Sequence, residues 1–367
     1  MKRIPIKLFS HMVANFYRLD RLFISVLLVL ALVNVVIQYS ANDKVAWRLI
    51  NDIAYLCLAF GVLVAVSHLN LNHLKTLAKP LYILSIILLI LVLLVGVTKH
   101  GAKRWLNLGI RLQPSELCKI SVPLLLAYYF SLKHEVLSYG DYFKATVLLL
   151  IPFCLIVKQP DLGTAILVLL AGFWVMFFCG LPWRVIIAGL VILALATPVI
   201  WHFLHPYQQH RVLTLLNPTS DPLGKGYHII QGAIAIGSGG IWGKGYLQGT
   251  QVHLDFIPEK HTDFVLTVLA EEFGFVGVTL ILVLYLLLVW RGIKIMQQAQ
   301  DRFSQALAGS ITLSLLLYIL INMGMVAGIF PVVGVPLPLI SYGGSATVVL
   351  MFGFGILLAI ARHNKYD

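Results

Sequence analysis

Residues 263–290 read DFVLTVLAEEFGFVGVTLILVLYLLLVW, and this stretch decides the fold class. An apolar run of about 17–25 residues is long enough to cross a bilayer as an α-helix. The run nevertheless has Asp263 at its start, with Glu271 and Glu272 two turns inside it. Carboxylates are costly where a chain enters lipid, so these acids need a functional or a structural explanation.

The composition of the whole chain agrees with a membrane protein. Of its 367 residues, 59% are hydrophobic and 11% are charged, whereas a soluble domain carries about 25% charged residues. The sequence predicts an all-α integral membrane protein that forms one polytopic domain over residues 1–367. It has about ten apolar runs, at 22–39, 48–67, 80–98, 116–132, 144–158, 162–181, 184–203, 263–290, 305–328 and 339–361. The fifth is short for a span, so nine spans are the alternative.

The distribution of Lys and Arg predicts the orientation. The tail before the first run contributes five of them, and the side that holds both termini carries the larger share. Cytoplasmic segments are enriched in Lys and Arg, so both termini are predicted to be cytoplasmic. Residues 204–262 then form a long extracytoplasmic loop, which includes a possible surface helix, GYHIIQGAIAIG. The outer segments 99–115 and 204–262 are also basic, which indicates an anionic partner unless these side chains only anchor the interface.

Several other classes of site are not expected. The four cysteines fall inside apolar runs at no metal-ligand spacing, which argues against disulfides and zinc. The glycines of the long loop match neither a P-loop nor a dinucleotide fingerprint. Neither a nucleotide site nor a nucleic acid partner is expected.

Charged residues inside apolar runs are the candidate functional residues. Glu116 and Lys119 in LQPSELCKISVPLLL lie three residues apart, on one face of a helix that Pro114 and Ser115 would begin. A charge within a span costs about 2.5–3.5 kcal/mol, so such residues are usually functional or paired. A structural salt bridge at the interface is the alternative interpretation.

Two aspartates stand at predicted helix starts. Asp161 in KQPDLGT precedes one apolar run, and Asp263 follows Thr262 at the start of another. A helix N-terminus favours a carboxylate, so capping is an alternative to catalysis at both positions. Near the C-terminus, GIFPVVGVPLPLISYGGSA (328–346) contains three prolines that cannot continue a helix, which predicts a loop between the last two runs.

The motifs occur together in one order. GAKRWLNLG, QPSELCK, QPDLGT, DPLGKGYHIIQ, IGSGG, PEKHTDF, AEEFG and PVVGVPLPLISYGGSA resemble, over nearly the whole chain, the SEDS family (shape, elongation, division and sporulation), and VVGVPLP resembles its elongation branch. The resemblance implies a peptidoglycan glycosyltransferase of the bacterial cytoplasmic membrane. Such an enzyme polymerises lipid II on the outer face, works with a class B penicillin-binding protein and the elongation machinery, and depends on Mg²⁺ or Mn²⁺.

The resemblance also assigns residues. Asp263 matches the essential aspartate of the family, and Glu116 and Lys119 match its functional pair in the fourth span. Further positions match the family pattern without a defined role: Arg48, Arg104, Asp161 and Arg211. Lys225 departs from the family, which commonly has alanine there, and this change puts no chemical role in doubt.

The expected mechanism uses one carboxylate. Asp263 and Glu271 are separated by about 12 Å along a helix, whereas paired carboxylates of glycosidases lie about 5–9.5 Å apart. A single base, Asp263, suffices when pyrophosphate is the leaving group, and Glu271 and Glu272 are then structural or gating residues. A lipid II flippase is the alternative function, although a carrier should have its binding chemistry on a midplane path. A pure scaffold would explain neither Asp263 nor the pair of Glu116 and Lys119.

Overall fold

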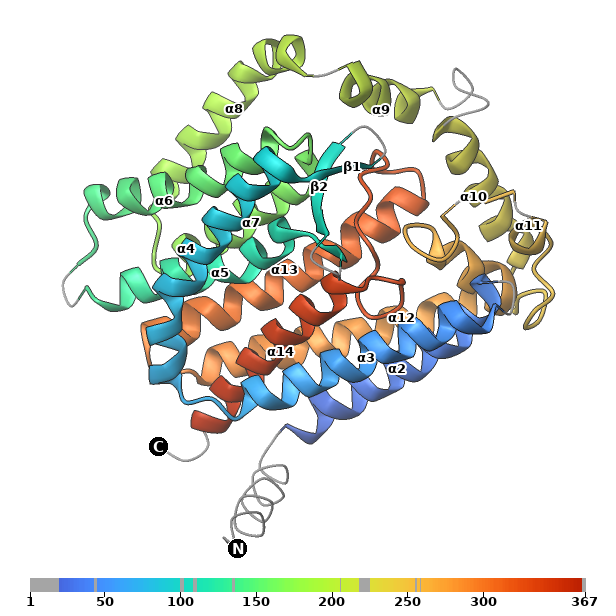
Figure 1. Cartoon of the computed structure of the whole chain (residues 1–367), viewed down its shortest axis with the longest axis horizontal. Helices are drawn as coiled ribbons and strands as arrows, with labels where there is room; N and C mark the ends of the chain where they lie inside the picture. Colours follow the sequence, from blue (N-terminus) through green and yellow to red (C-terminus); the bar gives the residue numbers. More distant parts are fainter. Residues whose placement is uncertain are drawn as a thin grey trace, which may run out of the picture.

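The computed structural model describes residues 20–42, 45–99, 102–107, 111–133, 136–204, 206–217, 225–254, 256–257 and 259–364. These residues form a mainly helical structure (Figure 1). The helices are α2 (Arg21–Ala41), α3 (Ala46–Ser67), α4 (Leu71–Val95), α5 (Pro114–Ser131), α6 (Tyr139–Val157), α7 (Leu162–Phe178), α8 (Trp183–Phe203), α9 (Pro206–Leu216), α10 (Lys225–Gly239), α11 (Thr250–His253), α12 (Val265–Gln298), α13 (Arg302–Val326) and α14 (Ser345–His363).

Each predicted apolar run overlaps one of these helices. Within the described ranges, seven helices are long and apolar enough to cross a membrane: α2, α3, α4, α6, α12, α13 and α14. Helices α7 and α8 contain shorter apolar stretches, and α5 starts at Pro114, as predicted. The protein is therefore a multi-pass membrane protein.

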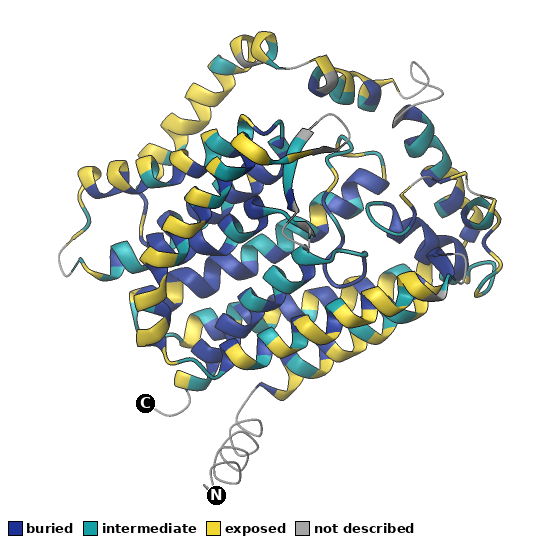
Figure 2. Ribbon diagram, in the orientation of Figure 1, coloured by how far each residue is buried: buried dark blue, intermediate teal, exposed yellow. Residues whose placement is uncertain are grey.

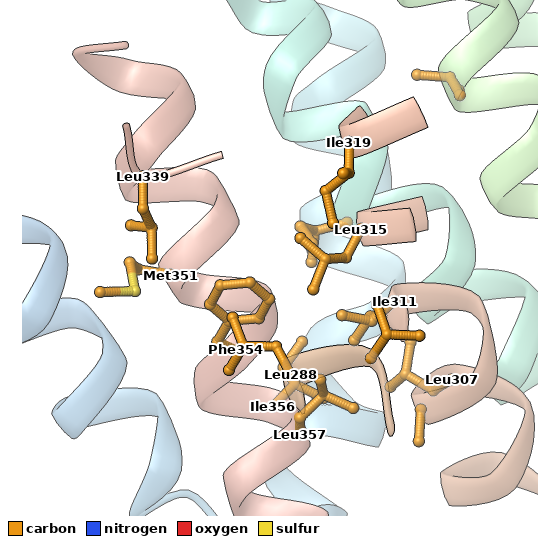
Figure 3. Packing of buried hydrophobic residues seen from close by; sticks show 14 of the residues in the cluster. Leu288, Leu307, Ile311, Leu315, Ile319, Leu339, Met351, Phe354, Ile356 and Leu357 are labelled. Carbon is orange, nitrogen blue, oxygen red and sulfur yellow. The ribbon is translucent and has the colours of Figure 1, made fainter. Parts of the chain in front are cut away.

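Helix α13 lies in the middle of the bundle and packs against α12, α7 and α5. Leu307, Ile311, Leu315 and Ile319 recur every four residues and form a buried stripe along it. Figure 3 shows this stripe close to side chains from α12 and α14, including Phe354. Residues four apart share one face of a helix, so this spacing directs α13 into the core.

Helix α8 has a different environment. It curves away from the bundle, and Figure 2 shows it exposed along most of its length. Large apolar side chains such as Ile187, Leu190 and Leu195 are more than half exposed. An apolar helix with exposed side chains on every face is suited to lipid surroundings rather than to water.

One expectation about the segments between the long helices needs correction. The prediction of an all-α fold is wrong at residues 97–112, where β1 (Val97–Lys99), β2 (Ala102–Asn107) and β3 (Arg111–Leu112) form a small antiparallel sheet in the order β1-β2-β3. The strands pair backbone groups that a coil would leave without partners. The described part of residues 204–262 contains helices α9, α10 and α11, and α10 includes the predicted surface helix and packs on α12.

Helix α12 is interrupted at Gly274, which has φ +65° and ψ −161°. Two amides beyond the interruption, those of Phe275 and Val276, donate to Gly240 O (2.9 Å) and Ile241 O (3.1 Å). A Cβ on Gly274 would lie 2.3 Å from the backbone nitrogen of Gly243. Only glycine fits this left-handed, crowded position, where the segment after α10 meets α12.

Candidate active site

Strand β2 directs two neighbouring basic residues to opposite sides. Lys103 donates from Nζ to Leu93 O and Leu94 O, at 2.9 Å each, and so caps the end of α4. The Arg104 guanidinium instead donates to Pro160 O and lies 3.7 Å from Asp161 Oδ1. Lys103 is therefore structural, whereas Arg104 reaches the turn before α7.

Asp161 is buried and caps α7, so the capping alternative holds at this position. Its Oδ1 accepts from Thr164 N at 3.3 Å, and its Oδ2 accepts from Gln113 Nε2 at 2.9 Å. The Arg104 Nε atom is buried and has no hydrogen-bond partner. The Arg104 guanidinium therefore has one N–H group without an acceptor. It lies beside the Asp161 carboxylate, whose two oxygens already accept hydrogen bonds.

Glu116 and Lys119 form the predicted pair on the first turns of α5. Lys119 Nζ lies 2.7 Å from Glu116 Oε1, and their side chains are only 9% and 8% exposed. The ammonium also lies 5.0 Å from the ring centroid of Tyr318 on α13. A buried ion pair loses the hydration of both charges, so its members depend strongly on each other.

The backbone before α12 is held by contacts from two other segments of the chain. His261 O accepts from Gln38 Nε2 of α2 and from the amide of Tyr342, each at 2.9 Å. Thr262 O accepts from Ser341 Oγ at 2.6 Å. These bonds fix the segment that precedes Asp263 against α2 and against the loop before α14.

Asp263 itself is not the N-cap residue of α12, because that position is taken by Phe264, whose side chain makes no capping bond. The backbone of Asp263 is held through its carbonyl, which accepts from Asn322 Nδ2 at 3.1 Å. Its carboxylate faces Gly334, which has φ +82° and on which a Cβ would lie 3.3 Å from Oδ2. The capping interpretation is therefore wrong for Asp263, although it holds for Asp161.

These side chains meet in one cavity of about 490 Å³. Arg211 reaches it from α9, and the loop before α14 forms another wall. The cavity brings together six of the seven candidate residues from the sequence: Arg104, Glu116, Lys119, Asp161, Arg211 and Asp263. The seventh, Arg48, is exposed on α3 next to the Trp47 ring and is not among the lining residues.

The structure adds residues that the sequence did not single out. Glu259 and His228 line the cavity, and the Glu259 carboxylate accepts from Thr262 Oγ1 at 2.8 Å. Tyr318 and Asn322 contact Lys119 and Asp263 from α13. Glu259 lies inside the quoted motif PEKHTDF, but the two α13 residues lie outside every motif, so no local pattern could have indicated them.

Glu271 and Glu272 belong to a separate buried cluster. Glu271 accepts from Lys244 Nζ at 2.7 Å and from two backbone amides at the start of α11, those of Gln251 and Val252. Glu272 Oε1 lies 3.3 Å from His253 Nε2. These contacts tie α11 and the segment before it to α12, which supports a structural role for both glutamates.

The fold and this site define a class: a multi-pass membrane protein whose helix ends enclose a cavity with both acidic and basic walls. Comparison with known proteins is more specific. Residues 13–366 match the FtsW/RodA/SpoVE family of cell cycle proteins, and the chain belongs to that family.

Individual relatives cover nearly the whole chain. The chain is 47% identical to the peptidoglycan glycosyltransferase MrdB of Escherichia coli K12, over 95% of this chain and 94% of that one. Its structure is similar to a chain from a peptidoglycan synthase complex studied for the coordination of polymerization and crosslinking (TM-score 0.83, 34% identity, 95% and 99% covered). It is also similar to the rod shape determining protein RodA of Thermus thermophilus (TM-score 0.73, 31% identity, 95% and 98% covered).

Proposed function

We propose that this protein is a peptidoglycan glycosyltransferase that polymerises lipid II into glycan strands during cell elongation. The observation that carries the proposal is the cavity, where the Asp263 carboxylate shares a space with three cationic side chains: Arg104, Lys119 and Arg211. A glycosyl transfer from a pyrophosphate-linked sugar needs a base and positive charge for the leaving group. The identity to a named glycosyltransferase over nearly the whole chain supports the same activity.

The proposed topology has ten crossings, with both termini in the cytoplasm and with residues 204–262 and the cavity at the outer face of the bacterial inner membrane. It adds α5, α7 and α8 to the seven helices that are long and apolar enough to cross a membrane. Helix α5 has 18 residues, and at 1.5 Å per residue it covers about 27 Å, close to the thickness of the hydrocarbon core. In this arrangement, the lipid tail of the substrate stays in the bilayer while its pyrophosphate reaches the cavity.

The reaction forms one bond and breaks one. The acceptor hydroxyl oxygen attacks the anomeric carbon of the donor sugar, and the bond from that carbon to the pyrophosphate oxygen breaks. The Asp263 carboxylate takes the hydroxyl proton, which requires it to lie about 3 Å from the acceptor oxygen. The polyprenyl pyrophosphate leaves with the bonding electron pair, and Arg104, Lys119 and Arg211 stabilise the charge that develops on it.

We also propose a divalent cation that is shared between the cavity and the substrate. Within the described residues, no group of three or more His, Cys, Asp and Glu side chains is arranged to hold a metal ion by itself. Mg²⁺ usually binds through one or two carboxylates together with phosphate oxygens of the substrate. Glu259 and Asp263 both line the cavity, and they would supply the carboxylate ligands for Mg²⁺ or Mn²⁺. Such a cation neutralises negative charge on a pyrophosphate.

The proposed protein partner is a class B penicillin-binding protein of the elongation machinery. The support is the similar chain from a peptidoglycan synthase complex, in which polymerization and crosslinking are coordinated. A polymerase that makes uncrosslinked glycan needs a transpeptidase close to its product. Lipid II and the surrounding membrane lipid are the other proposed partners.

Polymerisation by the purified protein tests the proposal. Wild type in detergent, supplied with lipid II and Mg²⁺, is expected to form polymer, and Asp263→Asn is expected to lose it because the amide is not basic. Asp301→Asn is the matched control: Asp301 caps α13 and pairs with Lys75 at 3.4 Å, and Asn also caps helices. Substantial polymer from a well-folded Asp263→Asn variant would contradict the role of Asp263. Transport of lipid II by wild type without polymer would favour a flippase.

A further inference from the structure

One turn of α13 contacts both ends of the proposed reaction site. The ring of Tyr318 lies against the Lys119 ammonium, 5.0 Å from Nζ to the ring centroid. Asn322 donates from Nδ2 to Asp263 O at 3.1 Å and to Val335 O at 2.7 Å. Residues four apart lie on the same face of a helix. Helix α13 therefore joins a cation on α5 to a carboxylate that precedes α12.

Lys119 needs a contact from outside its own helix to have a defined position. Its four-carbon stem has many rotamers, and Glu116, its ion-pair partner at 2.7 Å, lies on the same helix. Tyr318 supplies a contact from a second helix. An aromatic face attracts an ammonium without adding formal charge, so it holds Lys119 without acting as a second competing anion. The ammonium has three donors, and the bond to Glu116 uses one of them.

Asn322 has the corresponding relation to Asp263. Its side chain is fully buried, and its amide group bonds two carbonyls from separate segments, Asp263 and Val335. Both segments border the cavity. The amide thus fixes the backbone of Asp263 relative to α13 and leaves the carboxylate of Asp263 toward the cavity.

We propose that Tyr318 and Asn322 are positioning residues that set the separation between Lys119 and Asp263. This inference rests on the proposed function, in which Lys119 binds the departing pyrophosphate and Asp263 accepts the proton. Helix α13 packs against both α5 and α12, so it can hold the two groups at a fixed spacing. A displacement of about 1 Å in such a site can cost about 100-fold in rate.

A double-mutant cycle tests the Tyr318 part. Tyr318→Phe and Tyr318→Leu are made in wild type and in the Lys119→Met background, and lipid II binding and polymerisation rate are measured. In wild type, Tyr318→Leu should weaken binding or rate by about 3- to 30-fold, as expected for loss of a cation–π contact, and Tyr318→Phe, which keeps the ring, should lose less than Tyr318→Leu does. In the Lys119→Met background, Tyr318→Leu should have no further effect on binding. Equal losses in both backgrounds would show that Tyr318 only packs the core.

A comparison of two asparagines tests the other part. Asn34 is also buried and donates from Nδ2 to Ile340 O at 3.0 Å, but it does not contact Asp263. Asn322→Leu should lower kcat at least tenfold more than Asn34→Leu does, after allowance for the change in melting temperature. Asn322→Gln, which keeps the amide, replaces Asn322→Leu if the latter does not fold. Equal effects at the two positions would overturn the proposal.

The two tests separate this inference from the function itself. Polymer from wild type with an additive Tyr318 cycle would refute the positioning role alone. If wild type binds lipid II but forms no polymer, the proposed function fails, while the binding cycle still reports whether Tyr318 acts through Lys119.

Discussion

Removal of Glu116 alone should destabilise the protein more than removal of the whole pair. In Glu116→Ala, the Lys119 ammonium loses its partner at 2.7 Å while its side chain stays 9% exposed. Breaking a buried pair costs about 3–5 kcal/mol. Because the pair lies at the wall of a cavity, we expect the lower end, about 3 kcal/mol. At about 2 °C per kcal/mol for a large domain, the melting temperature should fall by about 6 °C.

The double variant Glu116→Ala with Lys119→Met removes both charges. It leaves no buried ammonium without a partner, and Met also occupies apolar surroundings well. At least half of the lost stability should therefore return. Melting temperatures of wild type, both single variants and the double variant, measured in one detergent, complete the cycle. Strictly additive losses would refute the coupling and show that the ion pair contributes nothing to stability.

Two further predictions concern the arginines and the break in α12. Arg104→Lys should lower the rate of polymerisation about tenfold, because a lysine cannot reproduce the planar guanidinium that reaches Pro160 O and Asp161. Arg48→Lys should keep the wild-type rate, because Arg48 is exposed outside the cavity. Equal loss in both variants would place the anion site elsewhere. Gly274→Ala should cost at least about 1–3 kcal/mol from its positive φ alone, while Gly61→Ala, with nothing within 4 Å of the new Cβ, should not reduce the melting temperature. An unchanged melting temperature for Gly274→Ala would contradict the close packing against Gly243.

The sequence by itself determined that this is a membrane protein and where its helices lie. Apolar runs must be as long as the bilayer is thick, so their length and spacing report each helix without knowledge of its neighbours. Local chemistry also predicted the start of α5 at Pro114 and the pairing of Glu116 with Lys119. Both features depend only on residues within four positions of each other.

Local chemistry could not show which aspartate caps a helix. Asp161 and Asp263 both precede helices, and only the structure shows that the first caps α7 while the second does not cap α12. The short sheet at residues 97–112 was also missed, because strand pairing depends on partners that a reading of apolar runs does not include.

Only the tertiary structure decided which charged residues act together. Arg48 and Arg104 are equally basic in the sequence, yet one lies beside Trp47 and the other in the cavity. Tyr318 and Asn322 gain their importance from contacts with α5 and with the segment before α12. Such contacts join residues far apart in the chain. They depend on how helices pack, and an apolar helix surface alone does not specify which neighbour covers it.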